Sequence, residues 1–240
     1  MGLDRVTITG ADDSVEPAAL ADLAREFPFV EWGLLFSQKH QGAPRYPQRA
    51  WVERAIDAFA GRAALSAHLC GAYVRDFVCA GRFSWRDDDA WPSALFARVQ
   101  LNFHGESHFA SPRFAEYVRD AGFEFILQFD GKNDRWFEWM VRAGLASPLF
   151  DRSGGAGALP AQWPPRVGDA YCGYAGGLGP DNVAAQLDLI AAAAGRGTYW
   201  IDMERRVRTD DDAALDLAKV RAVLERCAPY VESRGYGHGV

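Results

Sequence analysis

The chain has little of several features that mark particular classes of protein. Its 240 residues include only four cysteines, which lie far apart and form no CxxC pair. No apolar run approaches the roughly 18–20 residues that a helix needs to cross a bilayer. Basic residues are not in excess, since 26 lysines and arginines face 32 acidic residues and the net charge is -6. This balance argues against a protein that binds nucleic acid or a membrane surface, because both need a basic face.

The cysteines and the first residues favour a location inside the cell. Cys70, Cys79, Cys172 and Cys227 are expected to be free thiols in a reducing compartment, most of them in the core. The segment after Met1 enters a strand pattern directly, without the apolar stretch and cleavage site of a signal peptide. We therefore expect a cytoplasmic protein that is a monomer or a homodimer.

What the sequence does contain is a regular alternation of short β-rich runs with longer stretches of helical spacing. Eight runs are expected to form strands, at residues 5–10, 30–37, 64–70, 98–103, 124–129, 147–150, 170–174 and 198–203. Helices are expected at residues 16–26, from about 47, and at 73–80, 111–121, 133–143, 180–194 and 211–231. Asn133 is expected to cap its helix, and Pro180 to open one in the first turn.

Eight strands that alternate with helices predict a parallel sheet with right-handed crossovers. With 240 residues available, closure into a (β/α)₈ TIM barrel is more economical than an open doubly wound sheet, which is the alternative. No linker or change of composition divides the chain, so residues 1–240 are expected to form one domain. Residues 84–91 are interpreted as an elaborated loop, and four tryptophans as packing residues, namely Trp85, Trp91, Trp136 and Trp139.

In such barrels the functional residues lie at the C-terminal ends of the strands and in the loops that follow them. The candidates in chain order are Thr7, Thr9, Lys39, His40, Arg45, His68, Cys70, Gln100, Asn102, His104, Gln128, Asp130, Asp151, Asp202, Glu204, Arg205 and Arg206. His68 and Cys70 have the same parity and therefore share one face of their strand. If that face is the barrel interior, one of them could titrate near neutral pH; the alternative is a core histidine beside a buried thiol.

A metal site is the less favoured interpretation of these residues. His68, Cys70, His104 and Asp130 could supply ligands, but their positions show no ligand spacing. We therefore expect neither a metal nor another cofactor.

Two Gly-rich loops carry the strongest signals for a ligand. Gly176 and Gly177 are expected directly before a helix N-terminus, where backbone amides and the helix dipole favour an anion. In barrels the loops after the last two strands commonly hold phosphate, although a tight turn is the alternative role of these glycines. Gly154 and Gly155 follow Asp151 and are interpreted as part of a lid over the ligand, or merely as a connection.

The order of these motifs resembles that of phosphoribosylanthranilate isomerases, (β/α)₈ enzymes of the tryptophan pathway. The most specific match is A-G-G-L-G-P-D-N-V at residues 175–183. Weaker matches are T-I-T-G at 7–10, G-L-L-F at 33–36, P-R-Y at 44–46, F-D-R-S-G-G-A-G at 150–157 and I-D-M-E-R-R-V-R at 201–208. Between about 70 and 122, only V-Q-L at 99–101 and H-G at 104–105 resemble the family's Q-L-H-G.

The resemblance implies an Amadori rearrangement of an N-glycoside, in which an acid opens the ribose ring and a base takes the C2 proton. It places Asp151 at the acid position and Arg45 where the family pairs with the substrate carboxylate. It also places Asp202 at the family's strand-eight aspartate, as a brace for neighbouring loops. Thr9 falls where the family has a cysteine base, and a threonine hydroxyl does not ionise near neutral pH.

The last strand also departs from the family. Glu204, Arg205 and Arg206 replace the Ser-Ser-Gly whose amides bind phosphate in the family. The two arginines can still hold an anion, whereas Glu204 would repel one unless one of these arginines pairs with it.

Three functional hypotheses follow. The leading one is a diverged isomerase-like barrel that binds a small phosphorylated or carboxylated metabolite, with Asp151 as the acid. The missing cysteine base motivates a second, a catalytically silent barrel that binds a small anion or has a regulatory role. The third is a lyase or isomerase that uses His68 or Cys70 as its base, which requires a pKa of roughly 6–8.

Overall fold

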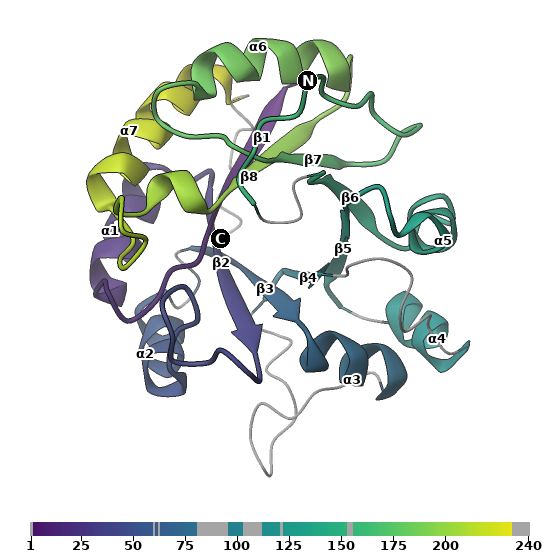
Figure 1. Ribbon diagram of the computed structural model, residues 1–240, viewed down its shortest axis with the longest axis horizontal. Helices are drawn as coiled ribbons and strands as arrows, with labels where there is room; N and C mark the ends of the chain where they lie inside the picture. The colour runs from purple at the N-terminus through teal and green to yellow at the C-terminus, as the bar shows by residue number, and fades with distance from the viewer. Residues whose placement is uncertain are drawn as a thin grey trace, which may run out of the picture.

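The computed structural model describes residues 2–59, 61, 63–80, 96–102, 112–120, 122–152 and 156–231. Eight strands, paired in parallel, close into a barrel in the order β1 to β8. Figure 1 shows the helices arranged around the outside of this barrel. The predicted (β/α)₈ fold is confirmed, and the open sheet is excluded. The loop predicted at 84–91, with Trp85 and Trp91, lies outside the described residues.

The strands are β1 (Leu3–Thr9), β2 (Val30–Ser37), β3 (Ala64–Cys70), β4 (Arg98–Asn102), β5 (Glu124–Phe129), β6 (Ser147–Phe150), β7 (Cys172–Ala175) and β8 (Tyr199–Met203). The α-helices are α1 (Pro17–Glu26), α2 (Arg49–Phe59), α3 (Ala72–Ala80), α4 (Pro112–Asp120), α5 (Asp134–Trp136), α6 (Val183–Ala194) and α7 (Leu217–Cys227). None of the helices in the described segments is both long enough and apolar enough to cross a bilayer.

The strand boundaries follow the prediction closely. β2, β3, β5 and β6 begin and end at the predicted residues. β1 begins earlier, at Leu3, because Leu3 still pairs with Tyr199 of β8 across a local irregularity of the ladder. β7 is displaced towards the C-terminus and covers Cys172–Ala175.

The predicted start of α6 at Pro180 is wrong, since the helix begins at Val183. The Asn182 side chain explains the difference. Its amide nitrogen donates to the carbonyl of Gly177 (2.8 Å), and its amide oxygen accepts from the N–H of Gly179 (2.9 Å). These bonds hold the residues before Val183 in a turn, an arrangement for which asparagine is well suited.

The predicted start of the last helix, at 211, is also wrong. α7 begins at Leu217, because the carboxylate of Asp216 caps it and accepts the N–H groups of Ala218 and Lys219, both at 3.0 Å.

The helix predicted at 133–143 forms a single α-helical turn, Asp134–Trp136, followed by a π-helix at Phe137–Val141. Asn133 does not cap it. Its side chain instead donates to the carbonyl of Gln128 (2.8 Å), which ties this turn to the end of β5.

The two faces of each strand have different chemistry. Residues of one parity are apolar and pack against the surrounding helices, as Ile8, Leu34, Leu69 and Ile201 do. The opposite parity points into the barrel and is largely polar, with Thr7, Thr9, Glu31, Ser66, His68, Arg98, Gln100, Gln128 and Asp202 all buried. The described part of the interior is therefore held largely by hydrogen bonds and ion pairs, together with a small apolar cluster that includes Ile126, Leu149 and Trp200.

A buried ion pair crosses the barrel interior. Arg98 on β4 binds both carboxylate oxygens of Glu31 on β2, at 3.0 and 2.5 Å, and Arg5 on β1 binds Glu31 at 2.7 Å. Arg98 also donates to the hydroxyl of Thr7 (3.2 Å). Burial alone would raise the pKa of Glu31, but the charges of Arg98 and Arg5 lower it to about 2, so the carboxylate stays ionised.

Trp200 fills the interior beside this pair. The guanidinium carbon of Arg98 lies 4.5 Å from the centre of the Trp200 ring. The indole is accommodated because the neighbouring residue on β7 is Gly173. A Cβ atom at that position would overlap the ring atoms Cε2 and Cζ2 of Trp200.

Gly173→Ala should therefore destabilise the protein. The added methyl group has to displace a fully buried indole that also contacts Arg98, and overpacking of this kind costs about 1–3 kcal/mol. The measurement is the free energy of unfolding from urea denaturation. Gly122→Ala is the matched control, because a Cβ atom there meets no atom within 4 Å. Equal stability of the two variants would show that Trp200 is not confined by Gly173.

Candidate active site

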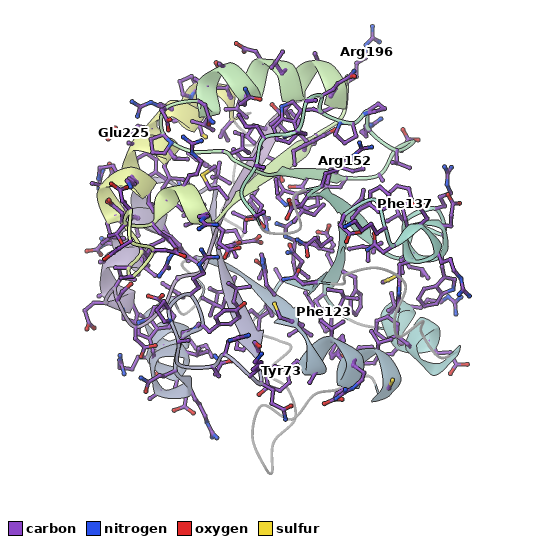
Figure 2. The ribbon with its side chains drawn as sticks, in the orientation of Figure 1. Tyr73, Phe123, Phe137, Arg152, Arg196 and Glu225 are labelled. Atoms are coloured by element: carbon purple, nitrogen blue, oxygen red, sulfur yellow. The ribbon has the colours of Figure 1, made fainter. Side chains whose placement is uncertain are left out.

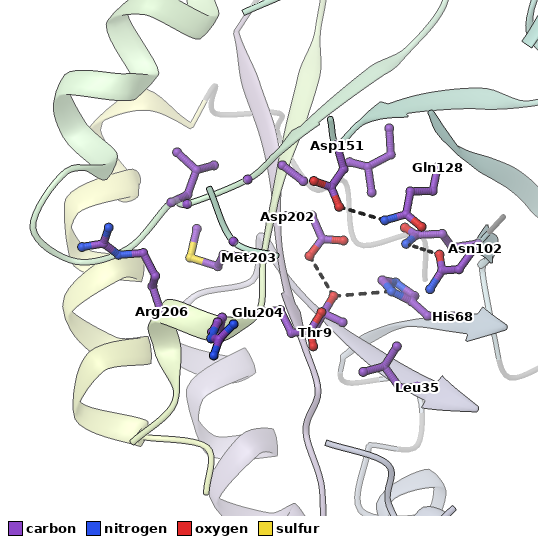
Figure 3. A pocket seen from close by; sticks show the side chains of 18 residues that line it. Thr9, Leu35, His68, Asn102, Gln128, Asp151, Asp202, Met203, Glu204 and Arg206 are labelled. Carbon is purple, nitrogen blue, oxygen red and sulfur yellow. Dashed lines mark hydrogen bonds between the residues drawn. The ribbon is translucent and has the colours of Figure 1, made fainter. Parts of the chain in front are cut away.

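A pocket opens at the C-terminal ends of the strands, which is where the sequence places the site (Figure 3). Its inner part has a volume of about 60 Å³ and is lined by side chains that include Thr9, His68, Gln100, Asn102, Gln128, Asp151, Asp202, Glu204, Arg205 and Arg206. An outer pocket of about 500 Å³ lies beside it, under the loops that follow β2 and β3. The two share Leu35, Asn102, Gln128 and Glu204, so a ligand could extend from one into the other.

Asp151 forms one wall of the inner pocket. It follows β6 directly and its side chain is buried. Gln128 at the end of β5 donates from Nε2 to Oδ2 of Asp151 at 2.8 Å, as Figure 3 shows. The Asp151 N–H donates to the carbonyl of Phe129 (3.1 Å), so two neighbouring strands fix the position of this carboxyl group.

Asp202 on β8 forms the opposite part of the site and begins a chain of buried polar groups. The hydroxyl of Thr9 donates to Oδ1 of Asp202 at 2.7 Å, and it lies 3.5 Å from Nδ1 of His68. Nε2 of His68 is 3.0 Å from the hydroxyl of Ser66. Figure 3 shows the contacts that link Asp202, Thr9 and His68. Three strands, β1, β3 and β8, thus contribute to one hydrogen-bonded chain.

Gly33 on β2 makes room for this chain. A Cβ atom at Gly33 would lie 2.6 Å from Oγ1 of Thr9 and 2.9 Å from both Cε1 and Nε2 of His68. Any larger residue would therefore push Thr9 and His68 away from each other.

The two titratable groups of this chain shift in opposite directions. Burial raises the pKa of Asp202 to about 8, although the hydrogen bond from Thr9 acts against the increase. Burial lowers the pKa of His68 to about 3, so the imidazole is neutral at neutral pH. Asp202 therefore exchanges a proton near neutral pH, whereas His68 does not.

Cys70 lies at the end of β3 and faces the outer pocket. Asn102 donates from Nδ2 to its sulfur at 3.2 Å. Burial raises the pKa of the Cys70 thiol to about 12. The pKa values of both His68 and Cys70 thus lie outside the range of roughly 6–8 that their use as a base requires.

Arg45 lies at the rim of the outer pocket and is part of an ion-pair network. Its guanidinium binds Glu204 at 2.6 Å and Asp212 through two nitrogens, one of them at 3.2 Å. The fully buried Arg208 also binds Asp212 (2.9 Å) and, on its other side, Asp12 (2.9 Å). A substrate carboxylate could bind Arg45 only in competition with these acidic groups. The charge of Glu204 is balanced by Arg45, and not by the arginines that follow it in the sequence.

The glycine loop after β7, which the sequence predicts to bind an anion, differs in structure from the prediction. Gly176 and Gly177 do not directly precede α6, because the turn that ends at Asn182 intervenes. Both glycines have positive φ angles, of 117° and 64°. A Cβ atom at either would clash with the backbone of Ala158 or Leu159, so these glycines let the loop after β6 pack against the loop after β7.

The two arginines after β8 line the inner pocket in different ways. Arg206 binds Asp181 at 2.6 Å and is partly exposed. Arg205 packs against Gly157, where a Cβ atom would lie 3.4 Å from Cβ of the arginine. Arg205 is therefore the better placed of the two cations for a ligand in the inner pocket.

Some predicted site residues are not part of the described site. Gly154, Gly155 and His104 lie outside the described residues. Asp130 is buried and accepts the N–H of Lys132 (2.8 Å) in the turn after β5. Within the described segments, His, Cys, Asp and Glu side chains form no group of three or more that could hold a metal ion.

Sequence reasoning missed Ser66, Gly33 and Asp212. The parity that places His68 in the interior also predicts that Ser66 points inward. No local pattern marks Asp212, which meets Arg45 only because the fold joins the loops after β2 and β8.

Asp202→Asn should change how stability depends on pH. Folding raises the pKa of Asp202 from 3.8 to about 8, so the native state binds more protons than the unfolded chain between these values. This group therefore makes the free energy of unfolding fall as the pH rises through that range, by at most about 1.4 kcal/mol per pH unit. Asparagine does not ionise, so the stability of Asp202→Asn relative to the wild type should increase steadily from about pH 5 to pH 8.

Urea denaturation at several pH values measures this difference. Asp57→Asn, on the exposed side of α2, is the control and should follow the wild type at every pH. A constant difference between Asp202→Asn and the wild type would mean that Asp202 is ionised throughout the range.

Comparisons with known proteins support the fold and go no further. No family model matches the chain, and no curated protein matches its sequence. Phosphoribosyl anthranilate isomerase from Thermus thermophilus is similar in structure, with 20% identity over 94% of this chain and 98% of that one and a TM-score of 0.57. A truncated 3-deoxy-D-arabino-heptulosonate 7-phosphate synthase from Thermotoga maritima has 10% identity over 95% of this chain and 86% of that one, with a TM-score of 0.52. These similarities show that the chain has the TIM-barrel fold, which it shares with an isomerase and a synthase.

Proposed function

We propose that the protein is an acid–base isomerase of the aldose–ketose type, diverged from the phosphoribosylanthranilate isomerases that its sequence resembles. Its substrate is a small cytoplasmic metabolite that carries a phosphate or carboxylate group. The observation that carries this proposal is the pair of buried carboxyl groups, Asp151 and Asp202, which line one pocket and are held by different partners. Two carboxyl groups in unlike environments can act as acid and base in one reaction.

In the proposed reaction, Asp151 gives its proton to the ring oxygen of an N-glycoside, and the C1–O bond breaks to leave a C1=N iminium group. Asp202 then takes the proton from C2, the C–H electron pair forms a C1=C2 double bond, and the iminium electrons return to nitrogen. The resulting enol gives its O–H proton to the ionised Asp151 and receives at C1 the proton that Asp202 holds, which yields the ketose and restores both carboxyl groups. The substrate is isomerised without any net oxidation, and the proposed steps need no cofactor.

The assignment of the base to Asp202 follows from its surroundings. Thr9 occupies the position of the family's cysteine but cannot ionise near neutral pH. It donates instead to Oδ1 of Asp202, which leaves Oδ2 for the substrate. Burial raises the pKa of Asp202 to about 8, and this makes its carboxylate a stronger base than an ordinary aspartate.

The anionic group of the substrate is assigned to Arg205. This residue lines the inner pocket beside Gly157 and the loop that follows β7. Glu204 would repel the anion, but its ion pair with Arg45 (2.6 Å) offsets that repulsion.

A second candidate is a binding barrel without turnover. The observation in its favour is the pairing of Arg45 with two carboxylates and of Arg206 with Asp181, which leaves fewer charges for a substrate. Turnover separates this candidate from the isomerase.

An assay with phosphoribosylanthranilate tests the isomerase proposal. We expect the wild type to turn over this substrate slowly and Thr9→Cys to be faster, because a thiol restores the family's base position. Asp151→Asn and Asp202→Asn should each lower kcat of the wild type by about 10²–10⁴-fold, the contribution of one general acid or base. Asp57→Asn, on the exposed side of α2 and away from both pockets, is the control and should keep its activity.

Each outcome has a clear meaning. A wild-type rate typical of the family would contradict the divergence. Binding of the substrate without turnover by the wild type or Thr9→Cys would favour the silent barrel. Full activity in Asp202→Asn would assign the base to another residue.

A further inference from the structure

Gln100 on β4 is buried in the barrel interior, with only 3% of its surface exposed, and it lines the inner pocket. Its amide nitrogen donates to Oδ1 of Asn102 at 2.8 Å. Its amide oxygen, Oε1, is buried and has no hydrogen-bond partner among the described residues. Burying an acceptor without a partner costs free energy, so a group that enters this pocket and donates to Oε1 removes that cost.

The Gln100 amide belongs to a hydrogen-bonded chain that leads through Asn102 to Cys70 at the outer pocket. The sulfur of Cys70 accepts from Nδ2 of Asn102 (3.2 Å), and the thiol lies 3.9 Å from the carbonyl of His68. Asn102 then has its oxygen directed towards Gln100 and accepts from Nε2. The oxygen of Gln100 is therefore the acceptor that this amide can offer to the pocket. The chain thus orients an amide whose two ends would otherwise be interchangeable.

The inner pocket contains other hydrogen-bond acceptors as well. Asp151, Asp202 and Glu204 line the same inner pocket. A ligand that fits these groups has to supply hydrogen-bond donors. Hydroxyl groups are small enough for the inner volume of about 60 Å³, and each can donate one hydrogen bond.

We propose that Gln100 determines specificity by accepting a hydrogen bond from a substrate hydroxyl, so that the inner pocket selects polyhydroxylated ligands. The inference rests on the proposed function only in taking this pocket as the substrate site. In this arrangement Cys70 and Asn102 are positioning residues. In this role they act through the Gln100 amide, although Asn102 also lines both pockets and Cys70 lines the outer one.

Binding measurements with two probes of equal charge and chain length test the proposal. Ribitol 5-phosphate carries hydroxyl groups along its chain, whereas n-pentyl phosphate carries none. Calorimetric titration of the wild type should show that ribitol 5-phosphate binds about tenfold more tightly or better, since loss of a partner for a buried acceptor has an effect of at least this size. Ribitol and 1-pentanol, compared by ligand-observed NMR, form an uncharged arm.

Two substitutions at Gln100 provide the matched variants. Gln100→Met keeps the length of the side chain but has no oxygen, and it should reduce the preference for ribitol 5-phosphate about tenfold with little effect on n-pentyl phosphate. Gln100→Glu keeps an acceptor at the pocket and should retain the preference. Circular dichroism and thermal unfolding establish that both variants are folded.

The outcomes separate this inference from the proposed function. Equal binding of both phosphates by the wild type, no binding of any probe, or an equal loss for both phosphates in Gln100→Met would overturn the role of Gln100. A preference for ribitol over 1-pentanol, without binding of either phosphate, would support Gln100 and contradict the anionic substrate. If Gln100→Met removes the preference but the wild type has no isomerase activity, the role of Gln100 is supported and the function is that of a binding barrel without turnover.

Discussion

The ion pair between Glu31 and Arg98 is the constraint on which the rest of the interior depends. Each residue is almost fully buried, and together they join strands that are not neighbours. Breaking such a pair leaves an uncompensated charge in the core, at a cost of about 3–5 kcal/mol. Thr7, Arg5 and the ring of Trp200 make further contacts with the two ions, whereas Nη1 of Arg98 is buried without a hydrogen-bond partner among the described residues. The part of the interior around Glu31 and Arg98 therefore has one arrangement. The site lies next to it, towards the C-terminal ends of the strands.

The effect of this charged layer reaches the site. Ser66 is the Cα partner of Arg98 in the β3–β4 ladder, and Gln100 is the partner of His68. β4 thus carries both Arg98 of the ion pair and Gln100 of the site, and β3 carries Ser66 and His68 beside them. Because Asp202 is buried above this layer, its carboxyl group is costly to ionise, and the hydrogen bond from Thr9 offsets that cost only in part. Burial is therefore the main cause of the raised pKa of this aspartate.

Much of this structure could be predicted from the sequence, and the failures have a common cause. The strands were predictable because each is a short β-rich run bounded by turn residues, and parity correctly grouped His68 with Cys70. The helix start was wrongly predicted at Pro180 because a turn made by Asn182 precedes the helix. Local composition does not distinguish such a turn from the first turn of a helix. The partners of Arg45 were not predictable, since Glu204 and Asp212 are 159 and 167 residues away along the chain. Local patterns specify elements, whereas ion pairs between loops exist only after the barrel has closed.

The pairing of charges also explains why the inherited motifs do not determine the ligand. Arg45 alone would make the mouth of the barrel an anion site, but Glu204 and Asp212 balance its charge. Both Arg45 and Asp212 have positive φ angles, of 76° and 61°, which residues other than glycine seldom adopt. Two costly backbone conformations at the two ends of one ion pair indicate that the pairing itself is held in place by the loops. Because Arg45 and Arg206 are already paired, the proposed discrimination by hydrogen bonds relies on groups such as the buried oxygen of Gln100, which has no partner among the described residues.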